Sequence, residues 1–128
     1  MNHLPEVEKL RACTERHYNC AQSLMVPFRE VTGLSEEESD RLGKLLGSGM
    51  HNGGLCGTIT SATMILSLAG YGKDVSTALI KDFRNNHGSL QCRDLLAASA
   101  GRGVPRKTHC DGLVFEITRY LDEVLSRK

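Results

Sequence analysis

The residues of this sequence that are best able to do chemistry are its five cysteines. A thiol acts as a nucleophile, a redox group or a metal ligand once it loses its proton. The first turn of a helix favours the thiolate, because its backbone N–H groups are unpaired and its dipole is positive there. Helix caps or glycines come shortly before four of the five: Asn19 before Cys20, Gly53 and Gly54 before Cys56, Ser89 before Cys92, and Thr108 before Cys110. We therefore predict that these four thiols lie in the first turns of helices, whereas Cys13 lies within a helix as an ordinary packed or surface thiol.

The spacing of the four cysteines means that any shared site must form by tertiary folding. Cys20, Cys56 and Cys92 are each 36 residues apart, and Cys110 follows 18 residues later. The C-x-x-C pair used by common zinc modules and by thioredoxin-like proteins is absent. If the helix N-termini converge, the thiols meet in one positively polarised pocket, which suits thiolate redox chemistry or ligation of zinc or an iron–sulfur cluster. The candidate catalytic residues and the candidate metal ligands are therefore the same four: Cys20, Cys56, Cys92 and Cys110.

Cys56 is the thiol that we expect to react first. Gly53 and Gly54 leave the start of the following helix unshielded, and Gly57 keeps its first turn open beside the sulfur. Helix N–H groups and the dipole would then lower the pKa of Cys56 by about one unit. The alternative is that packing seals Cys56 and raises its pKa.

A histidine precedes each of the four cysteines closely in the sequence. An imidazole beside a thiol can accept its proton, stabilise the thiolate or bind a metal. The alternative for each is a solvated side chain in a loop or at a helix end. The four are His17 before Cys20, His51 before Cys56, His87 before Cys92 and His109 before Cys110.

The sequence pattern predicts an all-α protein, a compact single-domain bundle of five to seven helices over residues 1–128. Ser35 and Glu38 form a capping box, Pro27 should kink or end the second helix, and alternation typical of strands is absent. The basic segment "RGVPRK" is predicted to be a solvated loop. The expected helices run from Pro5 to His17, from Cys20 to Thr32, from Ser35 to about Leu46, from about Leu55 to Gly70, from Asp74 to Gly88, from Ser89 to Gly101, and from Thr108 to the C-terminus.

Composition narrows the classes of function. A net charge of +1 with sparse aromatic residues argues against a nucleic-acid partner. The longest apolar run, residues 59–69, contains four hydroxyl residues and is too short to span a membrane. The charged N-terminal sequence does not resemble a secretory signal, so we expect a cytoplasmic protein. In that compartment, cysteines are more often redox-active or metal-binding than structural disulfides.

Four sequence segments carry a resemblance to a known family: "YNCAQSLM", "GGLCGTITSATMILSL", "GSLQCRDLL" and "HCDGLV". With these segments the chain resembles, from about Leu10 onward, the small redox-active proteins named for the pattern C_GCAxxG_C_C. The family's central Cys-Gly-Ala-x-x-Gly differs here at Thr58 and Ser61, and both residues are small enough to keep close helix packing. The resemblance implies a helical four-cysteine protein, and it supplies no substrate.

Three functions fit the sequence. The first is a redox-active thiol protein, whose cysteines cycle between dithiol and disulfide or aid electron transfer with an unidentified redox partner protein. The second is a protein that binds a metal or an iron–sulfur cluster through the four cysteines. The third is a helical binding module whose cysteines only pack. We place the redox function first and the packing function last, and leave enzyme activity, cofactor and oligomeric state open.

Overall fold

The computed structural model describes residues 2–127. Helices joined by turns and loops make up this range, which contains no strand and only a single bridge between Leu55 and Gln91. The fold class is therefore all-α, as predicted. The elements are α1 (Leu4–Ala12), α2 (Cys20–Met25), α3 (Arg29–Thr32), α4 (Glu36–Gly43), η1 (Gly49–Gly53), α5 (Gly57–Leu68), α6 (Lys73–His87), α7 (Cys92–Gly101) and α8 (Arg106–Leu125).

The predicted count of five to seven helices is wrong, since the described residues form eight α-helices and the short π-type turn η1. Two local causes account for the difference. Pro27 ends the second helix, so that α2 and α3 are separate elements. The glycine-rich stretch before Cys56 was not predicted to be ordered, yet it forms η1, in which Met50 and His51 have left-handed backbone angles.

Local side-chain chemistry defines the two helix starts that were read correctly. Asn19 begins α2 and Ser35 begins α4, and both are complete capping boxes, with Gln22 and Glu38 reaching back to the cap. Gly33 and Gly88 end α3 and α6 in left-handed conformations, which glycine adopts without steric cost.

Three other predicted helix starts are wrong by a few residues, and the first helix, predicted to reach His17, ends at Ala12. Helix α6 begins at Lys73, so Asp74 lies within its first turn instead of capping it. Helix α7 is preceded by Gln91, and the Ser89 hydroxyl instead accepts the Gln91 N–H. Helix α8 begins at Arg106 directly after Pro105, which is earlier than the predicted cap at Thr108. The basic segment is thus partly helix rather than a solvated loop.

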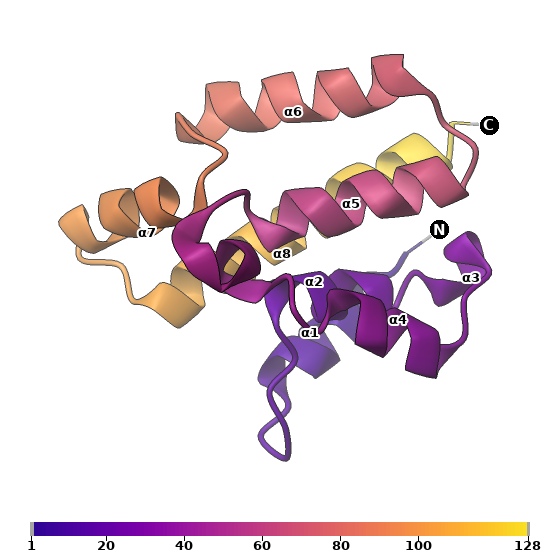
Figure 1. Cartoon of the computed structure of the whole chain (residues 1–128), viewed down its shortest axis with the longest axis horizontal. Coiled ribbons are helices and arrows are strands. Elements are labelled where there is room, and N and C mark those ends of the chain that lie inside the picture. The colour runs from indigo at the N-terminus through magenta and orange to yellow at the C-terminus, as the bar shows by residue number, and fades with distance from the viewer. Residues whose placement is uncertain (1, 128) are drawn as a thin grey trace.

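Helix α5 lies at the centre of the molecule. It contacts α2, α3, α6 and α8, and Figure 1 shows it between α6 above and the layer that contains α1, α2 and α4 below. Its small residues allow this: Ser61 and Ala62 are fully buried, and the Ser61 hydroxyl donates to the Gly57 carbonyl oxygen within the helix at 2.8 Å. The largest fully buried side chains of the core are Phe28, Phe83, Leu24 and Met25, together with Ile59 and Ile65 of α5 itself.

The two ends of the described chain are held together by a buried histidine. His3 is 5% exposed and stacks on the Phe28 ring, with the ring centroids 3.9 Å apart. Its Nδ1 is 2.6 Å from an Asp122 carboxylate oxygen on α8, and its Nε2 is 2.7 Å from Glu30 on α3. The His3 backbone N–H also donates to Asp122. This arrangement anchors α1 against α8.

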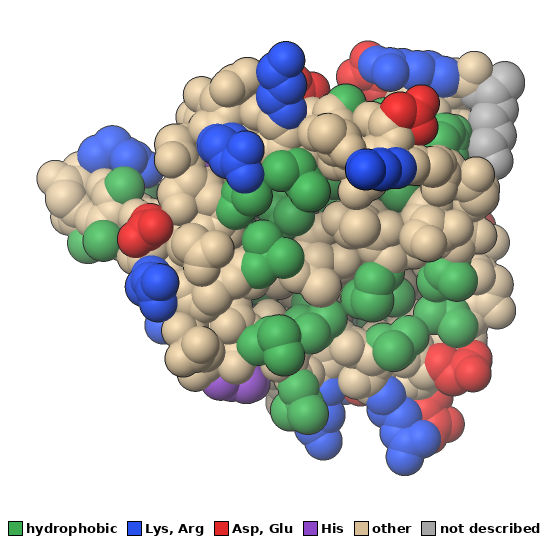
Figure 2. All heavy atoms as spheres, turned by 45° about the horizontal axis from the view of Figure 1, so that its top comes forward, with side chains coloured by type: hydrophobic (Ala, Val, Ile, Leu, Met, Phe, Trp, Pro, Cys, Tyr) green, Lys and Arg blue, Asp and Glu red, His purple; other side chains and the backbone are tan. Residues whose placement is uncertain are grey.

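The outer surface is not uniformly polar. Figure 2 shows apolar side chains across the middle of one face and charged side chains around its margin. Within residues 2–127, no helix combines the length and the apolar character needed to cross a membrane. The exposed large apolar residues are Leu42, Leu45, Met50, Leu55 and Leu68.

Candidate functional site

Four cysteines that belong to or directly precede four different helices line one pocket of about 990 Å³. They are the same four that the sequence singled out: Cys20, Cys56, Cys92 and Cys110. Cys13 is not among the lining residues. All five cysteines are free thiols in this structure. Tertiary folding therefore brings together thiols that are far apart in sequence, as the spacing required.

Three of these cysteines lie at the beginning of a helix. Cys20 and Cys92 are the first residues of α2 and α7, and Cys56 is the residue immediately before α5. Cys110 is more than one turn inside α8, because that helix begins at Arg106. The prediction for Cys13 is wrong in its detail, since α1 ends at Ala12 and Cys13 has extended backbone at the helix end.

Cys20 is electrostatically central among the four thiols. Burial is the main cause that raises the pKa of Cys56, Cys92 and Cys110, and the charge of a Cys20 thiolate raises each of them further. At Cys92, the charge of Cys110 adds more than that of Cys20. A thiolate on Cys20 therefore raises the pKa of each of the other three pocket thiols.

The expectation that Cys56 has a lowered pKa is wrong. Cys56 is only 5% exposed, and burial raises its pKa to about 11. The predicted helix contribution is present, because hydrogen bonds from the Thr58 hydroxyl and from the backbone N–H groups of Thr58 and Ile59 lower this pKa. Burial outweighs these hydrogen bonds, so the sealed-thiol alternative describes Cys56.

Close packing at a glycine places Cys20 against the start of α5. A side-chain carbon added at Gly57 would lie 2.8 Å from the Cys20 sulfur and 2.7 Å from the Leu46 carbonyl oxygen. Neither distance is compatible with a real Cβ. Gly57 directly follows Cys56, so the absence of a side chain there lets the Cys20 sulfur approach the chain next to Cys56.

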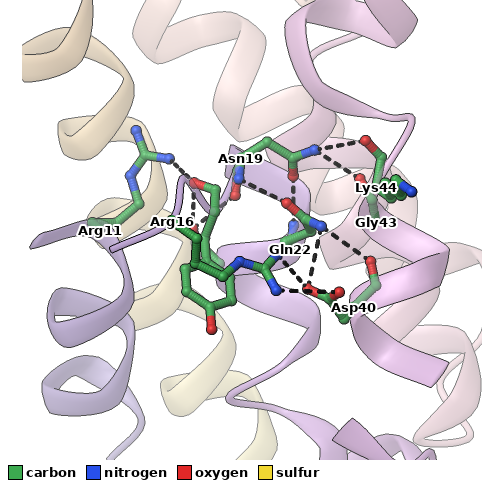
Figure 3. A network of polar contacts seen from close by, with 9 residues as sticks. Arg11, Arg16, Asn19, Gln22, Asp40, Gly43 and Lys44 are labelled. Carbon is green, nitrogen blue, oxygen red and sulfur yellow. Dashed lines mark hydrogen bonds and ion pairs between the residues drawn. The ribbon is translucent and has the colours of Figure 1, made fainter. Parts of the chain in front are cut away.

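A polar network fixes the start of α2 and with it the position of Cys20 (Figure 3). Asn19 donates from its amide to the carbonyl oxygens of Gly43 and Lys44 at 2.9 and 3.2 Å. Gln22 donates to the Asp40 carbonyl and carboxylate oxygens, both at 3.2 Å. Cys20 lies between Asn19 and Gln22 in the chain, so α2 is tied to α4 on both sides of the thiol.

Positive side chains surround the sulfur atoms on the side of α1 and α8. Arg106 donates hydrogen bonds to the Cys110 thiol and, at 2.6 Å, to the Ser48 hydroxyl. Arg11 donates to Asp111 at 2.7 Å and to the Tyr18 carbonyl oxygen at 2.8 Å. The charges of Arg11 and Arg106 lower the pKa of Cys110 against the larger effect of burial. Sequence reasoning did not find these two cations, although Pro105 is a signal for a helix beginning at Arg106.

Three of the four candidate histidines line the pocket, and one does not. His17, His51 and His109 are lining residues, whereas His87 lies outside and contacts Glu116 at 3.0 Å. Burial lowers the pKa of His17, and the charges of Arg11, Lys107 and Arg106 lower it further. Burial also lowers the pKa of His109. Both rings are therefore neutral near pH 7 and can accept a proton beside the thiols.

A metal site of the predicted kind is not preformed. Among residues 2–127, no three or more His, Cys, Asp or Glu side chains are arranged to hold a metal ion. The four cysteines as they lie here do not form a ready-made site for a metal ion. Their role as metal ligands stays a prediction.

The fold and the site together define a class: a helical protein built around a pocket of four cysteines. Residues 18–124 match the model of the family described as "Putative redox-active protein (C_GCAxxG_C_C)". The chain belongs to this family. The matched region contains the four pocket cysteines and leaves out Cys13. No curated protein and no solved structure matches the chain.

Proposed function

We propose that this protein exchanges electrons by cycling its pocket cysteines between dithiol and disulfide. The observation that carries the proposal is that the four thiols line one pocket, with the Cys20 sulfur packed against Gly57, the residue next to Cys56. Membership of a family of redox-active proteins supports the general class of function.

Cys20 and Cys56 are the pair that we assign to the first disulfide. Cys20 is partly exposed in the pocket and can meet an incoming disulfide, whereas Cys56 is buried. Gly57 allows the Cys20 sulfur to lie directly beside the chain next to Cys56. The exposed thiol is then the attacking group and the buried thiol is the resolving group, in the sense used for thiol–disulfide exchange.

The exchange balances as a transfer of two electrons and two protons. The Cys20 thiolate attacks one sulfur of an oxidised partner RSSR, an S–S bond forms, and RS⁻ leaves and takes up a proton. Cys56 then loses its proton, attacks the Cys20 sulfur of the mixed disulfide, and releases the second RSH. In the mixed disulfide Cys20 has no charge, so its contribution to the raised pKa of Cys56 disappears at this step. A neutral His17 or His109 at the pocket can accept a released proton.

The test is to count and map thiols in protein purified without oxygen. Metal content and visible absorbance are measured first, and the reduced, metal-free protein is then oxidised with diamide. We expect two of the five thiols to disappear and peptide mapping to find a bond between Cys20 and Cys56. The variants Cys20→Ser and Cys56→Ser should lose this bond, and Cys13→Ser, which changes a thiol outside the pocket, should keep it.

Two outcomes contradict the proposal. One is that all pocket thiols stay reduced in the folded protein under conditions that oxidise a small dithiol. The other is a stoichiometric metal or cluster bound by the four cysteines and needed for the fold, which would favour the metal function instead.

A further inference from the structure

The cysteine pocket is lined by more positive than negative side chains. Six Lys or Arg residues and two Asp or Glu residues line it, a formal excess of four positive charges in a chain whose net charge is +1. The six cations are Arg11, Arg16, Arg41, Lys44, Arg106 and Lys107. A cavity lined by one sign of charge concentrates ligands of the other sign.

Ion pairs inside the protein neutralise some of these cations and leave two without a carboxylate. Arg16 pairs with Asp40 at 2.8 Å, and Asp111 is shared by Arg11 and Lys107 at 2.7 and 3.1 Å. Among residues 2–127, no carboxylate pairs with Arg106 or with Lys44. Arg106 and Lys44 therefore keep their full charge for a ligand, and the single Asp111 carboxylate balances only one of the two charges of Arg11 and Lys107.

Arg106 is placed where it can act on a ligand that reaches the thiols. Its guanidinium lines the pocket, donates to the Ser48 hydroxyl at 2.6 Å and lowers the pKa of Cys110. Its charge also lowers the pKa of Cys92, a second pocket thiol. A guanidinium presents a planar set of donors that fits a carboxylate with two hydrogen bonds. A molecule whose sulfur reaches this cluster brings its neighbouring groups within range of Arg106.

The dimensions of the site fit a small molecule. A volume of about 990 Å³ is at the upper end for pockets that enclose small ligands. Cys20, the attacking thiol, lines this pocket and is partly exposed there, so a small disulfide that enters the pocket can reach its sulfur.

We propose that the substrates of this pocket are low-molecular-weight disulfides that carry carboxylates, with Arg106 and Lys44 binding the carboxylates. This inference rests on the proposed thiol–disulfide function and specifies its oxidant. The chemistry is the exchange described above: the small disulfide RSSR gains two electrons and two protons and leaves as two anionic thiols, and Cys20 and Cys56 become a disulfide.

The experiment compares two small disulfides of opposite charge. Glutathione disulfide is an anion near pH 7 and cystamine is a cation, and each is mixed with the reduced protein while the formation of free thiol is followed. Arg106→Gln and Lys44→Gln are the test variants. Arg84→Gln is the matched control, because Arg84 is an exposed arginine of α6 that does not line the pocket and its replacement removes the same charge.

The measured quantity is the rate with glutathione disulfide divided by the rate with cystamine. At low ionic strength we expect this ratio to be about tenfold or more higher in the wild type than in Arg106→Gln. Lys44→Gln should reduce the ratio as well, and Arg84→Gln should leave it unchanged. Because the ratio is compared between variants, the intrinsic reactivities of the two compounds cancel. In the wild type alone, added salt should also reduce the ratio, which tests the inference even if a variant fails to fold.

The outcomes separate this inference from the proposed function. The protein could react with both disulfides at a ratio of rates that neither salt nor Arg106→Gln changes. That result would overturn the proposal of an anionic substrate and leave the proposed thiol–disulfide exchange standing. Reaction with neither disulfide, in folded and fully reduced protein, overturns both.

Discussion

Ionisation of Cys56 should weaken the fold in alkaline solution. Burial raises the pKa of this thiol to about 11 in the folded protein, whereas an unfolded thiol ionises near 9. Between these values the unfolded chain has released the proton and the folded chain still holds it. The unfolded state then binds fewer protons, so the free energy of unfolding falls as the pH rises. Below pH 9 both states are protonated, and this stabilisation is fully present.

The size of the effect follows from the shift. A raised pKa of about 11 is two units above the ordinary value, and each unit corresponds to about 1.4 kcal/mol. The full loss is therefore about 2.7 kcal/mol once the pH exceeds the folded pKa, and about 2 kcal/mol at about pH 10.5. Because Cys56 is 5% exposed, solvent screens little of this difference.

Urea unfolding at about pH 8 and about pH 10.5, under reducing conditions and without oxygen, measures the effect. Three proteins are compared: the wild type, Cys56→Ala and Cys13→Ala. Lysines and tyrosines ionise in all three and contribute equally, so the difference between the variants isolates Cys56. Cys56→Ala should lose about 2 kcal/mol less than the wild type between the two pH values, although it is less stable at both because of the cavity it creates. Cys13→Ala should follow the wild type.

The reasoning is refuted if Cys56→Ala and the wild type lose the same stability between the two pH values. Alkylation gives an independent check. Iodoacetamide should modify Cys56 far more slowly than Cys13 at pH 7, and the Cys56 rate should rise about tenfold for each unit up to its folded pKa. Equal rates at pH 7 would show that Cys56 is not sealed.

Three further predictions concern the elements that hold the site. Gly57→Ala should destabilise the fold by about 1–3 kcal/mol, because the new carbon collides with a carbonyl oxygen and a sulfur. Gly101→Ala in α7 is the control and should not destabilise the fold, because its new carbon meets open space; thermal unfolding compares the two variants. Removing the cation of Arg106 should raise the pKa of His17 while burial keeps it below the ordinary value, and an NMR titration of Arg106→Gln would contradict this if the pKa stayed the same. His3→Ala should lower the unfolding free energy by about 3 kcal/mol, because it leaves the largely buried Asp122 carboxylate without its imidazole partner. A loss under about 1 kcal/mol would show that the contact between His3 and Asp122 is dispensable.

Local chemistry explains which parts of the fold could be predicted from the sequence. The Asn19 cap of α2, the capping box of α4 and the glycine ends of α3 and α6 depend on residues within a few positions of each other, and all four are confirmed. The predicted starts of α7 and α8 are wrong because Ser89 and Thr108, although favourable capping residues, are not the caps of these helices. Ser89 binds the Gln91 N–H in a turn before α7, and Pro105 sets the backbone for α8 earlier.

From the sequence, the four cysteines could be predicted to meet only if the helix N-termini converge, and that convergence depends on how the helices pack. The sequence placed the thiols near helix starts but gave no orientation for those starts. Their convergence depends on close contacts such as those of Gly57 with Leu46 and Cys20, which lie far apart in the chain. The cations at the pocket were missed for the same reason, since Arg11 reaches it from α1 and Arg106 from α8.

Cys56 shows why a helix start alone does not make a thiol reactive. Hydrogen bonds and the dipole at a helix N-terminus are worth about 0.3–1 kcal/mol each at an exposed site and up to about 2 kcal/mol when partly buried. Burial, with a smaller contribution from the charge of Cys20, leaves the pKa about two units high even after the hydrogen bonds of Thr58 and Ile59 are included, a net effect of about 2.7 kcal/mol. Sequence can locate the helix start, but only packing determines how much water the sulfur loses. The same burial that makes Cys56 a poor first nucleophile keeps it protonated and shielded from solvent. Those are the properties required of a thiol that must wait until Cys20 has formed a mixed disulfide.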